Sequence, residues 1–424
     1  MMKKLLVAAL IQSMAVCVFA QNTLNLGGDI SMLPQYEKAN TPYKTSTGVK
    51  ISNVINYMKN TCKMNSMRVR LFVTPDPTKA EEGVVQDLEY VKNLGKRIKD
   101  AGLDFMLCFH YSDSWADPSN QTIPSTWQDT SNEALMDSMY SYTKRCLEYL
   151  KENGATPDYV QIGNEISYGM LWRSNSDRCY ASATSGTWKR FTNLLSAAAS
   201  AVREVTPDAK IILHIERSGD VNTAVNFFTK MNANNVDYDI IGLSYYPFWH
   251  KLLPTLNNTL NTLETKFPDK PVQIVETAYY YQYFPTDHPE SYDDTTETWA
   301  GTPEGQKAFI EDLCTELAQH SNVTGLYYWF PEENGSGGIQ WDENNIVLRT
   351  YINRGLWNNS THMLNAAALS LKQFISKKEA VGIEETRADG NTEDTPTFTL
   401  CGQRVTSMSA AGIYIKNKKK VLKK

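Results

Sequence analysis

The sequence has few cysteines, and none of them stand in pairs of the kind that bind zinc. Of the seven cysteines in 424 residues, Cys17 lies in an apolar N-terminal stretch, and the others are scattered without a C-x-x-C pair or zinc-like spacing. Those others are Cys62, Cys108, Cys146, Cys179, Cys314 and Cys401. Cys108 stands inside an apparent strand, where cysteine is usually a small buried hydrophobe. The spacing supports neither a metal site nor a cysteine nucleophile, and it assigns no disulfide.

An excess of positive charge is also missing. Lysine and arginine number 42 against 47 aspartates and glutamates, which gives a formal net charge of −5. Domains that bind nucleic acids usually carry a basic patch or stripe. The composition therefore argues against a nucleic-acid partner.

Only one long apolar run occurs, and it stands at the N-terminus. Lys3 and Lys4 precede the apolar stretch from Leu5 to Phe19, and residues 18–20 suit cleavage before Gln21. The stretch is short for a transmembrane helix, which needs about 20 apolar residues. We predict a signal peptide over residues 1–20, no integral membrane span, and export to the periplasm, the cell surface or the medium.

Strand-like and helix-like runs alternate along most of the remaining chain, and this alternation predicts a (β/α)8 TIM barrel. The predicted strands are Leu24–Gly27, Met67–Val73, Asp104–Phe109, Tyr159–Gly163, Lys210–His214, Ile240–Ser244, Val272–Val275 and Gly325–Trp329. Helical spacing of apolar residues predicts helices at Val84–Lys99, Met136–Lys151, Trp188–Val205 and Gly305–Gln319. The segments after the strands are long and rich in aromatic and polar residues, which marks the functional face.

Two glutamates end predicted strands. Glu165 follows the apolar run that begins at Tyr159, and Glu276 follows the run that begins at Val272. The carboxyl ends of barrel strands form the active-site face. Retaining glycoside hydrolysis needs one acid/base and one nucleophilic carboxyl there, roughly 5–5.5 Å apart. Either glutamate alone could be a solvated strand-end residue, but the pair favours catalysis.

The composition changes near the C-terminus. Residues 377–397 are charged, polar and almost free of aromatics, as in a linker, so the catalytic barrel is expected over 21–376. Residues 398–424 contain short strand-like runs, which predict a small C-terminal β-type tail. The tail resembles C-terminal sorting signals of the type IX secretion kind, so secretion machinery is a possible partner. The alternative is a small β cap on the barrel.

The most specific motif is the loop from His110 to Pro118, with the sequence HYSDSWADP. It follows a predicted strand and combines a histidine, two aspartates and a tryptophan, which can hydrogen-bond and stack on a sugar. This string resembles glycoside hydrolase family 53, the endo-β-1,4-galactanases. Further segments resemble the family in the same order: Gly27–Ser31, Arg68–Phe72, Ile162–Glu165, Gly242–Phe248, Val275–Thr277 and Gly325–Trp329.

Some segments depart from the family pattern. After Trp329 the chain reads Phe330-Pro331-Glu332, and after Glu276 it lacks the usual early proline. Strand five ends in an unusual string from His214 to Asp220. These loops shape outer subsites, so the preferred chain length stays open, whereas the chemistry at the centre does not depend on them.

The resemblance implies roles for individual residues. Glu165 is expected to be the acid/base and Glu276 the nucleophile, kept ionised by Arg70. Adjacent strand residues face opposite ways, so Tyr245 or Tyr246, not both, should bond the nucleophile. The expected substrate-binding residues are Arg70, His110, Asp113, Trp115, Asn164, His214, Tyr245, Tyr246 and Trp329. Trp127, Trp172 and Trp249 could equally pack in loops.

Taken together, the motifs and the resemblance that they carry imply an exported, retaining endo-β-1,4-galactanase that acts on galactan or type I arabinogalactan without a cofactor or metal. The acidic segment 287–297 could hold calcium, but it lacks the regular ligand spacing of a calcium loop and is more simply a solvated loop. Two alternatives stay open: a related barrel glycosidase acting on mannan or glucan, and a non-catalytic glycan-binding protein on the same scaffold.

Overall fold

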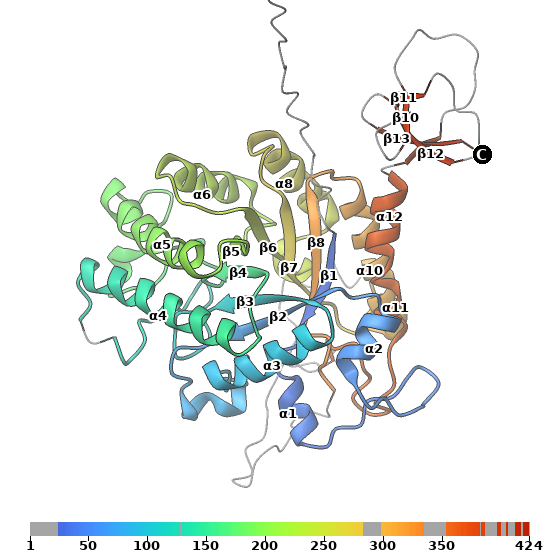
Figure 1. Ribbon diagram of the computed structural model, residues 1–424, viewed down its shortest axis with the longest axis horizontal. Coiled ribbons are helices and arrows are strands. Elements are labelled where there is room, and N and C mark those ends of the chain that lie inside the picture. Colours follow the sequence, from blue (N-terminus) through green and yellow to red (C-terminus); the bar gives the residue numbers. More distant parts are fainter. Residues whose placement is uncertain are drawn as a thin grey trace, which may run out of the picture.

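Eight parallel strands close into a barrel in the computed structural model of the chain, which confirms the predicted (β/α)8 fold (Figure 1). The strands are β1 (Asn25–Asp29), β2 (Ser66–Leu71), β3 (Asp104–Phe109), β4 (Tyr159–Ile162), β5 (Lys210–Ile215), β6 (Ile240–Tyr245), β7 (Val272–Thr277) and β8 (Val323–Trp329). The first strand pairs with the last, from Asn25 opposite Gly325 to Asp29 opposite Trp329. This pairing closes the ring and leaves the barrel sheet without an open edge.

The structure describes residues 24–127, 129–282, 298–334 and 353–381, together with the backbone of five short strands between residues 383 and 423. The predicted signal peptide and the acidic segment 287–297 lie outside these residues. Within the part of the chain that is described, no helix is both long and apolar enough to cross a membrane.

Helices surround the barrel (Figure 1). The main ones are α2 (Val54–Thr61), α3 (Leu88–Asp100), α4 (Asn132–Glu152), α5 (Ser185–Val205), α6 (Val221–Ala233), α8 (Leu253–Lys266), α10 (Pro303–Ala318) and α12 (Gln373–Val381). Shorter helical segments are α1 (Leu33–Lys38), η1 (Pro77–Glu82), η2 (Asn175–Asp177), α7 (Pro247–His250) and α11 (Ala366–Ser370). Their apolar sides pack on the outer faces of the strands to form one large hydrophobic core.

Capping residues explain where two helices begin. Helix α3 starts four residues later than the sequence pattern indicated, because the side chain of Asp87 accepts a hydrogen bond from Tyr90 N and caps it. Helix α4 starts four residues earlier than predicted, at Asn132, where Ser131 accepts from Ala134 N. The apolar periodicity missed this first turn because it is largely solvent-exposed.

The inside of the barrel changes from apolar to polar along its axis. A small apolar cluster, separate from the main core, consists of Met106, Ile212, Ile240, Val275 and Tyr327. Side chains two positions apart on a strand face the same way. His214 on β5 therefore follows Ile212 on the inner face, toward the carboxyl end of the barrel, where charged and hydrogen-bonding side chains replace the apolar ones.

The C-terminal boundary differs from the sequence prediction. Helix α12 packs on the barrel through the buried Phe374 and continues to Val381, five residues into the predicted linker, where Lys377 and Lys378 bond to Thr315 and the His320 carbonyl. Beyond it, β9 (Ile383–Glu385), β10 (Thr397–Thr399), β11 (Arg404–Val405), β12 (Gly412–Lys416) and β13 (Lys419–Lys423) form one sheet in the order β11-β10-β12-β13-β9. The β-type tail therefore also takes in a strand from the predicted linker.

Candidate active site

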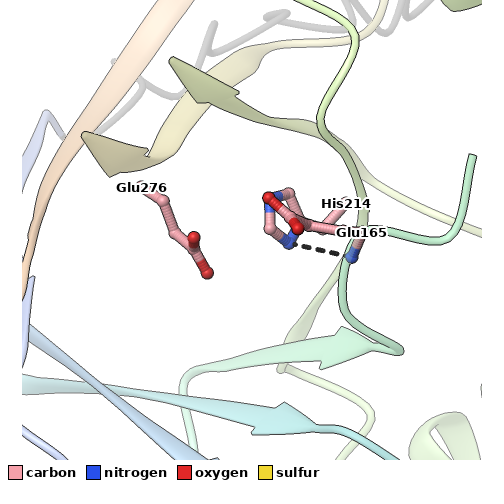
Figure 2. A group of neighbouring side chains, drawn as sticks. All are labelled: Glu165, His214 and Glu276. Atoms are coloured by element: carbon pink, nitrogen blue, oxygen red, sulfur yellow. Dashed lines mark hydrogen bonds between the residues drawn. The ribbon is translucent and has the colours of Figure 1, made fainter. Parts of the chain in front are cut away.

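The two glutamates meet at the carboxyl ends of the strands. Glu276 lies within β7, and Glu165 follows the end of β4 by three residues. One carboxylate oxygen from each glutamate lies within 4.8 Å of the other, with a ring nitrogen of His214 inside the same limit. Figure 2 shows the two side chains projecting into the same space from opposite sides. Oxygens this close fit the roughly 5–5.5 Å between the carboxyl groups of retaining enzymes better than the roughly 6.5–9.5 Å of inverting ones.

A cavity of about 430 Å³ opens over both carboxyls. Of the predicted site residues, its lining includes His110, Trp115, Asn164, Glu165, Tyr246, Glu276 and Trp329. It also includes residues that the prediction did not assign, namely Ala116, Asp117, Pro118, Glu216, Arg217, Trp249, His250 and Arg354. Trp249, which could have been loop core, is 54% exposed.

Two neighbours hold the carboxylate of Glu276. Arg68 Nη2 lies 2.8 Å from Oε1, and Tyr246 donates its hydroxyl hydrogen to Oε2 at 3.0 Å. Burial raises the pKa of Glu276, while the guanidinium and the phenol both oppose that rise by favouring the ionised form. Of the two predicted alternatives, Tyr245 and Tyr246, it is therefore Tyr246 that bonds the candidate nucleophile.

Arg70 is not the cation beside Glu276, which corrects the prediction. Both arginines face the barrel interior from β2, but Arg70 lies one level further along the strand. There its guanidinium lies 3.4 Å from Asp29 Oδ1 and stacks over the Trp115 ring, 4.4 Å from the centroid. Arg68 also pairs with Asp29, at 2.7 Å, so the two arginines share one buried carboxylate.

Glu165 has a different environment. Its backbone is in the left-handed region, with φ of 50°, a conformation that non-glycine residues adopt rarely and that is often found at active sites. Burial, then the nearby charges of Glu276 and Glu216, raise the pKa of Glu165 well above its ordinary value. The hydroxyl of Ser244 donates to Oε1 at 2.7 Å and opposes this rise. Glu165 is therefore suited to hold a proton, whereas the Arg68 cation beside Glu276 favours the ionised form of that carboxyl.

Asn164 links the two glutamates to the HYSDSWADP loop. Its Oδ1 accepts from Arg68 Nη2 at 2.8 Å, and its Nδ2 donates to the Ala116 carbonyl at 2.9 Å. The amide of Ala116 in turn donates to His110 Nδ1 at 3.1 Å. Burial, then Arg68 and Arg70, lower the pKa of His110 well below its ordinary value, so this histidine is neutral and its Nε2 carries the hydrogen.

Three other predicted substrate contacts lie outside the cavity lining. Asp113 accepts from Thr74 N at 2.9 Å and Ser125 N at 2.7 Å, so its carboxylate ties two loops together. Tyr245 donates to the Lys251 carbonyl at 3.0 Å on the outer side of β6. His214 is fully buried below Glu165, and both of its ring nitrogens already have partners within the protein.

A metal ion would have to compete with these contacts. Glu165, His214 and Glu276 are close enough together to bind one, but His214 Nε2 lies 2.8 Å from Ser244 Oγ and Nδ1 lies 3.0 Å from Gln161 Nε2. We interpret the group as a hydrogen-bond network. Among the described residues, five cysteines are free and buried, and burial raises the pKa of Cys108 to about 12, so its thiol is not a nucleophile.

Comparison with known proteins gives consistent matches over the barrel. The family model described as Glycosyl hydrolase family 53 matches residues 25–373. A Niallia circulans protein, described as uncharacterized and in the bgaB 5′ region, is 35% identical over 72% of this chain and 83% of its own length. The probable arabinogalactan endo-beta-1,4-galactanase A of Neosartorya fischeri is 32% identical over 76% of this chain and 88% of its own.

Solved structures give the same result. The Ignisphaera aggregans GH53 catalytic domain superimposes with a TM-score of 0.72 at 28% identity, over 83% of this chain and 96% of that domain.

Proposed function

Because the chain belongs to glycosyl hydrolase family 53 and is a glycoside hydrolase, we propose that it cleaves β-1,4-galactosidic linkages within galactan, such as that of type I arabinogalactan. The observation that carries the proposal is the pair of close carboxyls in one cavity, one of them with its pKa raised by burial and neighbouring carboxylates and the other paired with the Arg68 cation. The galactanase names of the relatives support galactan as the substrate.

The proposed reaction has two displacements. Glu165 donates its proton to the glycosidic oxygen while a carboxylate oxygen of Glu276 attacks the anomeric carbon, and the bond between that carbon and the leaving oxygen breaks. Glu165, now ionised, takes a proton from water. The water oxygen attacks the anomeric carbon, and the bond to Glu276 breaks, so the product keeps the β configuration.

The other cavity residues support this chemistry. Asn164 shares Arg68 Nη2 with Glu276 and lines the cavity, where an amide can hydrogen-bond the sugar 2-hydroxyl as positive charge develops on the ring. Trp115, Trp249 and Trp329 offer aromatic faces on the cavity walls, and such faces stack well on the apolar faces of sugars. Ring centroids of Trp115 and Trp329 are 6.2 Å apart in an edge-to-face arrangement, so these two walls meet at a corner.

A reducing-sugar assay on β-1,4-galactan, mannan and cellulose tests the substrate. We expect galactan to be hydrolysed at least tenfold faster than the other two. Faster release from mannan or cellulose would replace galactan in the proposal. Binding to a glycan without any release would favour the non-catalytic reading instead.

Proton NMR during early hydrolysis tests the mechanism. Retention predicts the β anomer first, followed by mutarotation. An α anomer appearing first would mean a single displacement and would remove the role of Glu276 as nucleophile. A parallel assay with Glu165→Ala should show a much larger loss on galactan than on an aryl glycoside, because a good leaving group needs little help from an acid.

We also propose that residues 1–20 direct export and that residues 398–424 carry a sorting signal. The basic start and apolar run of the N-terminal segment, and the Gly412-Ile413-Tyr414 string with its basic end, support this. Galactan is a polymer outside the cell. An enzyme that cleaves bonds within the polymer chain must therefore be exported to reach it.

A further inference from the structure

A directed chain of hydrogen bonds runs through the barrel interior from Arg68. Arginine has N–H donors and no acceptor, so a partner must present an oxygen to it. Gln161 Oε1 accepts from Arg68 Nε at 3.1 Å. The other half of the amide, Nε2, therefore faces away from Arg68, and it lies 3.0 Å from His214 Nδ1.

This arrangement determines which nitrogen of His214 carries the hydrogen. Two N–H groups face Nδ1: Gln161 Nε2 and the backbone amide of Glu165 at 3.4 Å, the dashed line in Figure 2. Asn164 Oδ1, which also accepts from Arg68 Nη2, lies 3.1 Å from Nδ1 as well, so the assignment of Nδ1 as an acceptor depends on the two N–H groups that face it. Burial and Arg68 lower the pKa of His214 well below its ordinary value, so the ring is neutral and has one N–H. With Nδ1 as an acceptor, that N–H is on Nε2.

The chain continues to the acid/base candidate. His214 Nε2 donates to Ser244 Oγ at 2.8 Å, and the Ser244 hydroxyl hydrogen goes to Glu165 Oε1 at 2.7 Å. The direction of these last two bonds follows from Nδ1 being the acceptor: Ser244 Oγ then receives a hydrogen from His214 and gives its own hydrogen to Glu165. Oε1 is consequently an acceptor whether Glu165 is protonated or ionised, and the acidic proton belongs on Oε2.

We propose that Ser244, oriented through His214 and Gln161, is a positioning residue that keeps the acidic proton of Glu165 on Oε2 and stabilises the carboxylate left after proton transfer. The proposal depends on the acid/base role of Glu165. It also gives Arg68 two tasks, because the same guanidinium pairs directly with Glu276. One buried cation thus acts on the nucleophile by contact and on the acid/base through three intervening side chains.

Other charged groups also act on Glu165. Glu276 on β7, Glu216 at the end of β5 and Asp117 in the HYSDSWADP loop all raise its pKa, and the Ser244 hydrogen bond opposes them. Removing the Ser244 hydroxyl leaves the three carboxylates unopposed by this donor. The pKa of Glu165 should then rise, and the acid form should persist to higher pH.

The kinetic test compares Ser244→Ala with the unaltered protein on whichever β-glycan the latter hydrolyses fastest. We expect the alkaline limb of the kcat/KM profile to move to higher pH. The value at the original optimum should fall about tenfold, which is typical for loss of a hydrogen bond to a charged group. Ser66→Ala is the matched control: Ser66 is equally buried and accepts a hydrogen bond from Tyr327 Oη at 2.8 Å, but it lies at the amino end of β2, away from the active-site face. An unmoved alkaline limb in Ser244→Ala would overturn the proposal.

A second measurement needs no substrate. The chain has six histidines, and NMR of protein labelled with ¹⁵N-histidine reports the tautomer of each. The fully buried His214 should keep a neutral ring with hydrogen on Nε2 between pH 5 and 8, and loss of the Ser244 hydroxyl should shift its signals. A ring with its hydrogen on Nδ1 would reverse the direction of the hydrogen bonds between His214, Ser244 and Glu165, and would refute the proposal. Failure to cleave galactan would remove only the proposed substrate, since both measurements stand for any β-glycan.

Discussion

At the scale of single residues, the carboxylate of Glu276 is a group whose role a small added anion can partly take over. Glu276→Ala should lower turnover on galactan by on the order of 10⁴-fold or more. The variant leaves a cavity faced by the Arg68 cation and the Tyr246 hydroxyl. Added azide or formate should bind there and restore part of the hydrolysis of an aryl glycoside with a good leaving group, because the small anion attacks the anomeric carbon. Near-full activity of the variant would show that another group is the nucleophile.

The two arginines of β2 should respond differently to the same change. Lysine cannot reproduce the fork of contacts that Arg68 makes to Asp29, Asn164 and Glu276. Arg68→Lys should therefore lower kcat/KM about 100-fold, the size expected when a buried charged pair is disturbed. Arg70→Lys loses the stacking on Trp115 and should mainly lower the melting temperature. Steady-state kinetics with thermal melts decide this, and equal kinetic losses would contradict the separation of roles.

The residue types of the site were predictable from the sequence, but some of their partners were not. Glu165, Glu276 and Asn164 stood at strand ends in motifs specific enough to identify. Arg68 and Arg70 are two positions apart on one strand, so both face inward and periodicity cannot separate them. Ser244 and Glu216 gave no signal of their own, because their neighbours come from other strands and depend on the register of the closed sheet.

At the scale of elements, the extent of helix α12 was predicted wrongly from the sequence. The polar composition after Ile375 resembles a linker, yet α12 continues to Val381. Its second half is polar because its lysines reach neighbouring groups: Lys378 donates to the His320 carbonyl and Lys377 to the Thr315 hydroxyl. Such tertiary hydrogen bonds leave no periodic signal, whereas the apolar faces of α4 and α5 were recognised because they repeat every helical turn.

This difference predicts where the chain can be cut. A protein of residues 21–381 should have the same melting temperature as the barrel of the full-length protein and should retain its activity on galactan. A protein of residues 21–375 lacks the contacts of Lys377 and Lys378 and should melt about 2–4 °C lower, the shift expected for a loss of roughly 1 kcal/mol. Calorimetry of the two proteins provides the measurement. Identical melting would mean that the second half of α12 contributes nothing to the barrel.

At the scale of the whole molecule, the barrel and the tail should be separable in function. Both glutamates and all eight barrel strands precede residue 330, and the tail sheet is built from residues after 382. Deleting residues 398–424 should leave hydrolysis of galactan unchanged in the test tube. In the native host the shortened protein should be found in a different compartment if the tail is a sorting signal. Cell fractionation of the two forms tests this, and an unchanged distribution would leave the tail without that role.

The closure of the barrel by β1 and β8 also has a consequence for folding during synthesis. The partner of β1 is β8, and Gly325 follows its partner Asn25 by 300 positions. The two strands therefore cannot pair until β8 has been synthesised. At ordinary synthesis rates of about 5–20 residues per second, roughly 15–60 s pass before the partner exists. During that time the first strand has an unpaired edge that can find the wrong partner, and contacts so distant in sequence form slowly. A chain of this topology gains from being kept unfolded until it is complete, and a delay before crossing a membrane would provide that interval.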